Sequence, residues 1–155
     1  MKKYLIILMC LFLLVGCKKE EPKPKELINL DTTKVGVALK SFESFSTEEN
    51  LNDEDLIQGY GIDTSLLDEY AIYISSIVED PSMYIVAKPK KDKESVVKFQ
   101  IKEMFDEYLS SYMGYYPNGV PIIENRLEKE YNGYLIYIAS FNNDAVYKKI
   151  LECKK

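Results

Sequence analysis

Apolar residues at helical spacing first appear in an orderly pattern just after residue 30. Val35, Leu39 and Phe42 fall on one face of a helix that is predicted to run through residues 32–42. Asp31 precedes this stretch, and an aspartate in that position is typical of a helix N-cap. The pattern therefore predicts an amphipathic helix at the start of the folded part of the chain.

The next periodic segments predict a β-hairpin followed by a long helix. Residues 69–78 and 82–88 are rich in β-branched and aromatic side chains, and Glu79-Asp80-Pro81 between them is a turn signal. The helix is expected to start near Asp92 and to end at Gly114. Its apolar stripe consists of Val97, Ile101, Met104, Tyr108 and Tyr112, widened by Phe105 and Leu109.

A second hairpin has the strongest local signal in the chain. The sequence Tyr131-Asn132-Gly133-Tyr134 is typical of a two-residue type I′ turn, which pairs Tyr131 with Tyr134 and Glu130 with Leu135. A last helix is predicted to begin at residues 142–144 and to bury Val146 and Ile150. The predicted register gives the hairpin a core face with Leu127, Tyr131, Tyr134, Ile136 and Ile138, and a wetter face with Arg126, Glu128 and Glu130.

The order of these elements predicts the fold class. One helix, a short helix near Leu56 and Ile57, and two ββα units follow each other in a chain of 155 residues, enough for one domain. Hairpins make antiparallel neighbours. We therefore expect a single α+β domain over residues 31–155, with a four-stranded, mostly antiparallel sheet and helices packed on one face.

The segment before residue 30 has a different pattern. Lys2 and Lys3 precede an uncharged, mostly apolar run from Tyr4 to Val15. This run is too short to cross a bilayer, which requires about 20 residues, and it is typical of a secretory signal. The chain then continues as Leu14-Val15-Gly16-Cys17 and turns at once to charged residues and proline.

The residues Leu14-Val15-Gly16-Cys17 resemble the lipobox of bacterial lipoproteins at all four positions. The resemblance implies cleavage between Gly16 and Cys17 and a diacylglycerol on the Cys17 thiol, so that residues 1–16 are a signal peptide. The protein is then expected on the extracytoplasmic face of the cell membrane, held by acyl chains. Residues 17–30 hold the lipidated cysteine and a charged, proline-containing tether. An uncleaved anchor, or a leader with an incidental cysteine, is the alternative.

Several short segments together resemble a known family. They are Tyr-Gly-Ile-Asp at 60–63, Ile-Ile-Glu-Asn at 122–125, the long amphipathic helix between them, and the strand–Asn-Gly–strand hairpin. They are similar to a family of bacterial lipoproteins of the Gram-positive type, whose extracellular α+β domain is labelled only as a domain of unknown function. The resemblance covers roughly residues 31–152 and implies the fold, with no activity and no catalytic residues.

Net charge and composition disfavour several classes of partner and of chemistry. The formal charge of −5 disfavours nucleic-acid binding and simple adsorption to an anionic membrane. With no histidine in the chain, Ser/His/Asp and Cys/His catalytic centres are excluded within one chain. The three cysteines, Cys10, Cys17 and Cys153, match no zinc or redox spacing. No phosphate-binding glycine motif occurs, so neither an enzyme nor a cofactor is expected.

Three stretches remain as candidates for other roles. Residues 48–55 are rich in carboxylates that calcium prefers, but the glycine and terminal glutamate of an EF-hand loop are missing, so a solvated loop and helix start is the favoured interpretation. Tyr115 and Tyr116, just past a predicted helix end, are candidates for surface contact with a sugar or a protein, and packing over the helix end is the alternative. Cys153 is interpreted as a packed residue in preference to an exposed thiol.

These observations favour one class of function. We expect a membrane-anchored binding domain without catalytic activity, whose partner is an envelope protein or a cell-wall component. A small ligand-binding or ion-binding lipoprotein at the cell envelope is the alternative, and it requires a concave pocket with converging polar groups.

Overall fold

The computed structural model describes residues 29–46 and 51–155. The predicted signal peptide, Cys17 and nearly all of the predicted tether lie outside these residues. Within the described ranges, no helix combines the length and the apolar character that crossing a bilayer requires.

The first helix, α2 (Thr32–Leu39), begins where the sequence predicts and ends earlier than expected. The Asp31 side chain accepts a hydrogen bond from the Lys34 backbone N at 3.0 Å, which is an N-cap interaction. Beyond Leu39 the chain does not continue the helix, since Phe42 is extended, with φ −86° and ψ 133°. It leads into the 3₁₀ turn η2 (Glu43–Phe45). Phe45 in this turn is buried, whereas Phe42 before it is half-buried.

The short helix predicted near Leu56 is confirmed as α3 (Asp53–Tyr60). Asn52 and Asp55 form a reciprocal capping box at its start, in which each side chain accepts a hydrogen bond from the backbone of the other. Gly61 ends the helix at φ +67°, a conformation that glycine adopts without steric cost. A 3₁₀ turn, η3 (Thr64–Leu66), then leads into the sheet.

Both predicted hairpins are present. Strands β1 (Leu67–Ile74) and β2 (Met83–Pro89) are antiparallel, and so are β3 (Leu127–Tyr131) and β4 (Tyr134–Ala139). The second hairpin has the predicted register, with Tyr131 opposite Tyr134. Its two turn residues both have positive φ, 49° at Asn132 and 79° at Gly133, as a type I′ turn requires.

The four strands form one sheet in the order β1-β2-β4-β3, with every neighbouring pair antiparallel. The two hairpins meet along β2 and β4, where Met83 pairs with Ala139 and Val86 with Ile136. These two strands are therefore central, and nearly all of their residues are buried. The predicted α+β fold with a four-stranded antiparallel sheet is confirmed.

The remaining helices follow the hairpins. The predicted long helix is α4 (Glu94–Tyr115), and the last helix is α6 (Asn143–Glu152), capped by Asn142. Between α4 and β3 lie a 3₁₀ turn, η4 (Pro117–Gly119), and a short helix that the sequence analysis did not anticipate, α5 (Val120–Glu124). The predicted stripe of α4 faces the core, with Val97, Ile101, Met104, Phe105 and Tyr112 buried.

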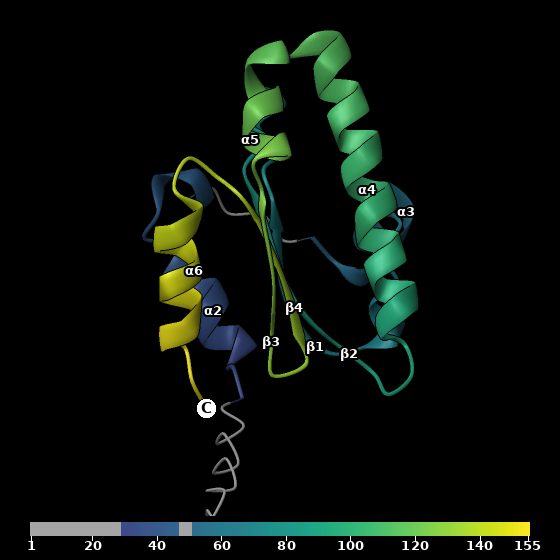
Figure 1. Ribbon diagram of the computed structural model, residues 1–155, viewed down its shortest axis with the longest axis vertical. Coiled ribbons are helices and arrows are strands. Elements are labelled where there is room, and N and C mark those ends of the chain that lie inside the picture. The colour runs from purple at the N-terminus through teal and green to yellow at the C-terminus, as the bar shows by residue number, and fades with distance from the viewer. Residues whose placement is uncertain (1–28, 47–50) are drawn as a thin grey trace, which may run out of the picture.

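Helices cover both faces of the sheet, which corrects the expectation that they would pack on one face. Figure 1 shows α2 and α6 on one side of the strands, α3 and α4 on the other, and α5 beyond one end of the strands. Ile123 of α5 belongs to the same core cluster as α4. Along β4, Ile136 packs with the α2 and α6 side, whereas Leu135 and Ala139 pack with the α3 and α4 side. On β3 the face expected to be wetter is exposed at Glu128 and Glu130, as predicted, whereas on β4 the same face is core. Because successive residues of β2 and β4 are apolar, both faces of these strands have to be covered.

Candidate functional site

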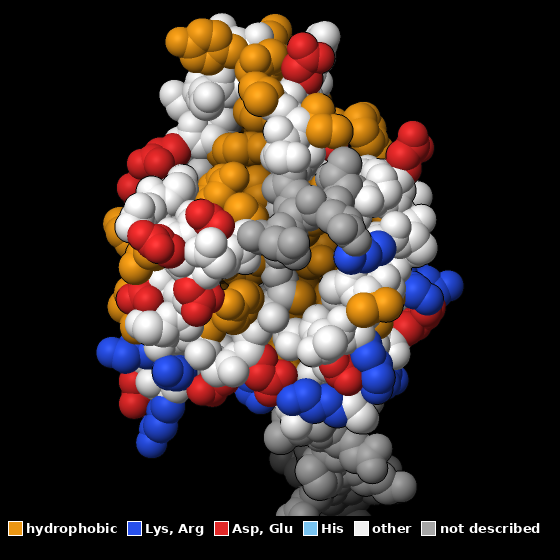
Figure 2. Space-filling model, turned by 180° about the vertical axis from the view of Figure 1, so that it is seen from behind, with side chains coloured by type: hydrophobic (Ala, Val, Ile, Leu, Met, Phe, Trp, Pro, Cys, Tyr) orange, Lys and Arg blue, Asp and Glu red, His pale blue; other side chains and the backbone are white. Residues whose placement is uncertain are grey.

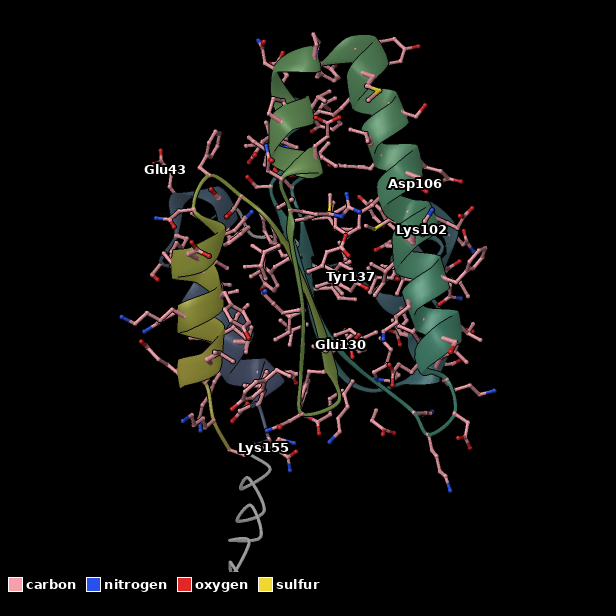
Figure 3. All side chains as sticks on the ribbon, viewed as in Figure 1. Glu43, Lys102, Asp106, Glu130, Tyr137 and Lys155 are labelled. Carbon is pink, nitrogen blue, oxygen red and sulfur yellow. The ribbon has the colours of Figure 1, made fainter. Side chains whose placement is uncertain are left out.

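The sheet has two ends that differ in what they carry. The first residues of the described fold and the C-terminus lie together at one end, which we call the tether end; it comprises residues 29–31, 90–93, 132–133 and 153–155 (Figure 1). The opposite end, which we call the distal end, comprises η2, the β1–β2 turn (residues 75–82), the end of α4 with η4 (residues 113–119), and residues 140–142. Figure 3 shows Lys155 at the tether end and Glu43 at the distal end.

At the tether end, hydrogen bonds join residues 29–31 to the C-terminal residues. The Asp31 backbone N donates to the Cys153 carbonyl at 2.8 Å, and the Lys155 backbone N donates to the Asn29 carbonyl at 3.0 Å. Residues 29–31 and the C-terminus thus form an antiparallel bridge, in which Leu30 is fully buried. The position at which residue 29 enters the fold is therefore fixed.

A buried tyrosine supports this end from within the fold. The Tyr134 hydroxyl donates to the Leu30 carbonyl at 3.0 Å and lies 3.1 Å from Glu69 Oε2. Burial, reinforced by the nearby Glu69 carboxylate, raises the pKa of Tyr134 to about 12. Burial also acts to raise the pKa of Glu69, but hydrogen bonds from Lys155 and Tyr134 outweigh it and hold that pKa below its ordinary value.

The distal end is held in place by Tyr112. Its side chain is 3% exposed, and its hydroxyl donates to the Val78 carbonyl in the β1–β2 turn at 2.9 Å. The ring also lies so close to Gly119 that a Cβ atom added there would be 2.5 Å from Tyr112 Cδ1. One side chain of α4 therefore fixes both the β1–β2 turn and η4, and only glycine fits at position 119 without displacing it.

The β1–β2 turn has a defined conformation with apolar side chains at its tip. The Asp80 backbone N donates to the Ile77 carbonyl at 2.8 Å, and Asp80 Oδ1 accepts from the Ser82 backbone N at 3.0 Å. These bonds close the turn and leave Ile77 and Val78 50% and 64% exposed. Both residues were predicted to lie in a strand, but β1 ends at Ile74.

A second exposed apolar residue lies in the connection from β4 to α6. Asn143 Oδ1 accepts hydrogen bonds from the backbone N and the hydroxyl of Ser140, at 2.8 Å and 2.9 Å. Asn142 caps α6 through the Ala145 backbone N at 3.1 Å. Between these fixed residues, Phe141 is 80% exposed.

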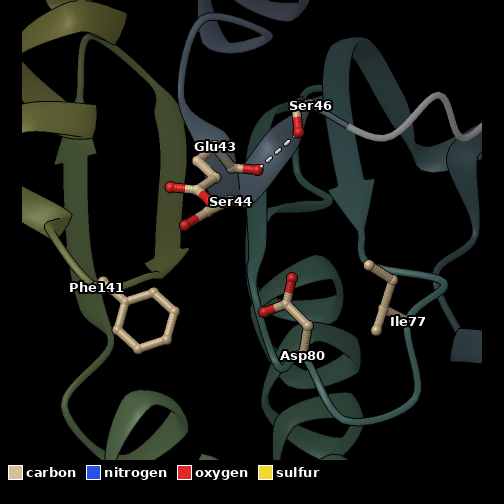
Figure 4. Close-up of a pocket in the computed structure, with 6 residues that line it drawn as sticks. All are labelled: Glu43, Ser44, Ser46, Ile77, Asp80 and Phe141. Carbon is tan, nitrogen blue, oxygen red and sulfur yellow. Dashed lines mark hydrogen bonds between the residues drawn. The ribbon is translucent and has the colours of Figure 1, made fainter.

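Phe141 and Asp80 line two adjoining clefts at the distal end. The first has a volume of about 470 Å³ and is lined also by Glu43, Ser44, Ser46 and Ile77 (Figure 4). In this view the Phe141 ring and the Ile77 side chain flank the Asp80 carboxylate on opposite sides. The second cleft, of about 310 Å³, is lined also by Glu79, Pro81, Asn118, Gly119 and Ile122. Four separate segments of the fold thus meet around two shared side chains.

The charges around these two clefts have one sign. Glu43, Glu79 and Asp80 contribute carboxylates to their lining, and no lysine or arginine lines either cleft. Figure 2 shows the same trend on one side of the molecule, where lysine and arginine side chains lie over the middle and the tether end, and the far tip carries apolar and acidic side chains. The distal end therefore combines exposed apolar residues with negative charge.

Half of the large exposed apolar residues of the described ranges lie at this end. Elsewhere in the described ranges they are spread over α2, α3, α4 and β1, as Val37, Ile57, Val96, Phe99 and Tyr70. At the distal end they are Ile77, Val78, Met113, Tyr115 and Phe141. Scattered apolar residues are ordinary on protein surfaces, whereas a concentration of them marks a candidate contact site.

The structure separates the two tyrosines that the sequence analysis selected. Tyr115 is 79% exposed and belongs to the distal end. Tyr116 is half-buried, and its ring centroid lies 5.8 Å from that of Tyr112, so it packs over the end of α4. Gly16 and Cys17 lie outside the described residues.

Sequence reasoning missed Phe141, Ile77 and Asp80 as members of this site. The available signal was an apolar residue in a segment of turn-forming residues, as in Ser140-Phe141-Asn142-Asn143. Connecting segments run over the surface, so exposure of such a residue is expected. Their convergence depends on the strand order and was not visible from the sequence.

The other candidates have structural roles. Cys153 is buried, and burial raises the pKa of its thiol, which agrees with the packed interpretation. In the acidic stretch, Asn52 and Asp55 cap α3, and residues 47–50 lie outside the described ranges. Within those ranges, no three cysteine, aspartate or glutamate side chains are grouped so that they would hold a metal ion. The buried polar residues of the described part are three serines, Ser75, Ser82 and Ser140.

Comparison with known proteins identifies a domain over most of the fold. Residues 42–140 match a domain of unknown function, DUF4358. No curated protein and no solved structure matches the chain. The match begins at Phe42, just before η2, and ends at Ser140, so it includes the sheet, α3, α4 and α5.

Proposed function

Because the chain belongs to the DUF4358 family, whose function is unknown, we propose a function from its own residues. The protein is a lipid-anchored domain on the extracytoplasmic face of the bacterial cell membrane. It binds an envelope protein or a cell-wall component through the distal end and has no catalytic activity of its own.

The observation that carries this proposal is the sequence Leu14-Val15-Gly16-Cys17 at the end of the apolar run. A small residue before the cysteine leaves a peptidase room to reach the backbone. A thiol is the side chain in this stretch that forms a stable thioether with diacylglycerol. Several acyl chains together hold a protein firmly, since each buried methylene contributes roughly 0.8 kcal/mol.

The position of residue 29 supports the direction in which the domain faces. From Cys17 to Asn29 the chain extends at most about 40 Å, and it enters the fold at the tether end. The distal end lies at the opposite end of the sheet (Figure 1). An anchor at Cys17 therefore leaves the distal end turned away from the membrane and accessible to other envelope components.

The character of the distal end supports binding. Its apolar residues are exposed on turns whose conformation is fixed by hydrogen bonds, so little conformational entropy is lost when a partner covers them. The absence of histidine from the sequence removes the commonest general acid and base. Both observations favour a contact surface over a catalytic centre.

The anchor is tested by following the mass and the location of the protein in cells. We expect globomycin, which inhibits the lipoprotein signal peptidase, to leave residues 1–16 attached and to raise the mass of the protein. We expect Cys17→Ser to abolish labelling by a radioactive or clickable fatty acid. Cys10→Ser is the matched control, because it removes the other cysteine of the leader and should leave labelling unchanged. Equal labelling of the Cys17→Ser variant would contradict the anchor.

Binding at the distal end is tested by photo-crosslinking in intact cells. A photoreactive phenylalanine analogue replaces Phe141 in one variant and Phe99 in the other; Phe99 is 61% exposed on α4. We expect a discrete crosslinked product from position 141 that is absent at position 99. Identical products from both positions, or none from position 141, would contradict the proposed role of the distal end.

A further inference from the structure

Building on the proposed function, we infer that the distal end binds a polypeptide segment in which an apolar or aromatic residue adjoins lysine or arginine. The apolar side chain packs against Phe141 and Ile77, and the cationic group lies against the carboxylates around the two clefts. The inference rests on the shape, the exposed residues and the charge of this end.

The apolar half of the inference follows from Phe141. Its ring is 80% exposed while the residues on both sides of it are held by hydrogen bonds. The backbone on both sides of Phe141 is therefore fixed, and it holds the ring at the surface. Covering such a ring with an apolar side chain removes apolar area from water, which is the main favourable contribution at the centre of protein interfaces.

The cationic half follows from the three carboxylates. Glu43 and Asp80 line the first cleft, Asp80 and Glu79 line the second, and neither lining includes a positive charge. Among the described residues, no ion pair involves any of these three side chains. A lysine or arginine of the partner is therefore the complementary group, and an arginine can also lie over the face of the Phe141 ring.

The distribution of charge along the chain reinforces this complementarity. Between Lys40 and Lys88 the sequence contains no lysine or arginine, and this segment includes η2 and the β1–β2 turn. Arg126 and Lys129 line a further cleft that also includes Phe141, whereas the carboxylates of this segment give the first two clefts a negative potential. This potential attracts cationic segments and repels anionic ones, including the anionic surface of the membrane.

The form of the two clefts favours a polypeptide over a small molecule. Small-molecule sites usually enclose most of their ligand, whereas here Phe141 and Ile77, which line the clefts, are 80% and 50% exposed. The two clefts adjoin through Asp80 and Phe141, so an extended segment can place successive side chains in both. This arrangement matches an apolar centre with a charged rim, as in protein interfaces.

The test is a selection of peptides by the full-length protein in detergent micelles. A random peptide library displayed on phage is bound to the wild-type protein, and the sequences that are retained are compared with the unselected library. We expect enrichment of peptides in which Lys or Arg adjoins an aromatic or aliphatic residue. Enrichment of acidic or uncharged peptides, or no enrichment, would overturn the inference.

Variants of the protein locate the binding of an enriched peptide. We expect Phe141→Ser to weaken it by about tenfold or more, because apolar anchors dominate such contacts. Asp80→Asn keeps the acceptor for the Ser82 backbone N and should weaken binding by about two- to fivefold, as should Glu43→Gln. Phe99→Ser is the matched control and should leave the affinity unchanged. Binding that Phe141→Ser does not alter, or equal binding of poly-lysine without apolar residues, would also overturn the inference.

This selection separates the inference from the proposed function. It reports on the chemistry of the distal end whether or not Cys17 is lipidated in cells. If Cys17 carries no fatty-acid label but the peptide selection succeeds, only the anchor is overturned. Labelled Cys17 together with failed selection would overturn the inference alone.

Discussion

The tether end and the distal end differ in how their polar groups are hydrogen-bonded and in whether their apolar side chains are buried. At the tether end, the Tyr134 hydroxyl and the backbone of residues 29–31 and 153–155 find partners inside the fold, and Leu30 is fully buried. At the distal end, the backbone is just as fixed, but Phe141, Val78 and Tyr115 are left exposed to solvent. The two ends are thus equally fixed, and they differ in that the distal end leaves apolar side chains exposed on its turns.

The largest expected effect is the loss of the side chain that fixes the distal end. Tyr112→Ala removes a buried ring from between η4 and the β1–β2 turn, and we expect it to lower the free energy of unfolding by about 3–5 kcal/mol. Denaturation in urea measures this change. Tyr112→Phe is the control, because it keeps the ring and removes only the bond to the Val78 carbonyl. An effect of Tyr112→Ala below that of Tyr112→Phe would show that the distal end is not fixed by this ring.

A smaller effect is expected from the buried tyrosine of the tether end. Tyr134→Phe leaves the Leu30 carbonyl without its donor, and we expect a loss of about 1–3 kcal/mol in the free energy of unfolding. Tyr131→Phe on the neighbouring strand is the control, because Tyr131 is half-buried and its hydroxyl makes no hydrogen bond to another described residue. If both variants were equally stable, the bond to Leu30 would not support the tether end.

The tether end is also expected to depend on pH through Glu69. Because the pKa of Glu69 is lower in the folded protein than its ordinary value of 4.5, its interactions stabilise the fold above that value, and the stabilisation is lost as the pH falls through the folded-state pKa. Glu69→Gln should lower stability at neutral pH by less than about 1 kcal/mol, since solvent screens a partly exposed carboxylate. Urea denaturation at several pH values checks this, and a difference that grows below pH 4.5 would contradict it.

The smallest effect on stability is expected at Phe141, and it tests most directly how the distal end differs from the tether end. Phe141→Ser removes a ring that is 80% exposed, and we expect the free energy of unfolding to change by no more than about 0.5 kcal/mol. The same variant should lose binding of cationic, apolar peptides. A large loss of stability would mean that Phe141 packs within the fold, and the distal end would then no longer combine rigidity with exposed apolar surface.

Local sequence signals predicted the parts of the fold that depend on neighbouring residues. Asn132-Gly133 fixed the register of the second hairpin, because only residues that tolerate positive φ form a type I′ turn. Asp31 marked the start of α2 by capping it. The helix α5 was not predicted; it is only five residues long, and Pro121 lies in its first turn, where proline is accommodated.

The packing of the hairpins was not predictable from such signals. The register between β2 and β4, which sets the order β1-β2-β4-β3, joins residues that are far apart in the sequence, such as Met83 and Ala139, and no turn specifies it. For the same reason, helices were expected on one face of the sheet only. The sequence did not show that Leu135 and Ala139 pack in the core together with α4. The candidate site followed from this packing, because Asp80 and Phe141 come together only when β2 and β4 are adjacent.

By itself the sequence determined the presence of both hairpins, the register of the second one, the start of α2, the apolar face of α4, and the features of residues 2–17 that predict a lipid anchor. These depend on backbone preferences and side-chain periodicity within a few residues. Only the tertiary structure decided that helices cover both faces of the sheet and that Phe141, Ile77 and three carboxylates meet at the distal end. The physical reason is that burial of apolar surface has no direction along the chain, so distant elements are arranged by mutual packing.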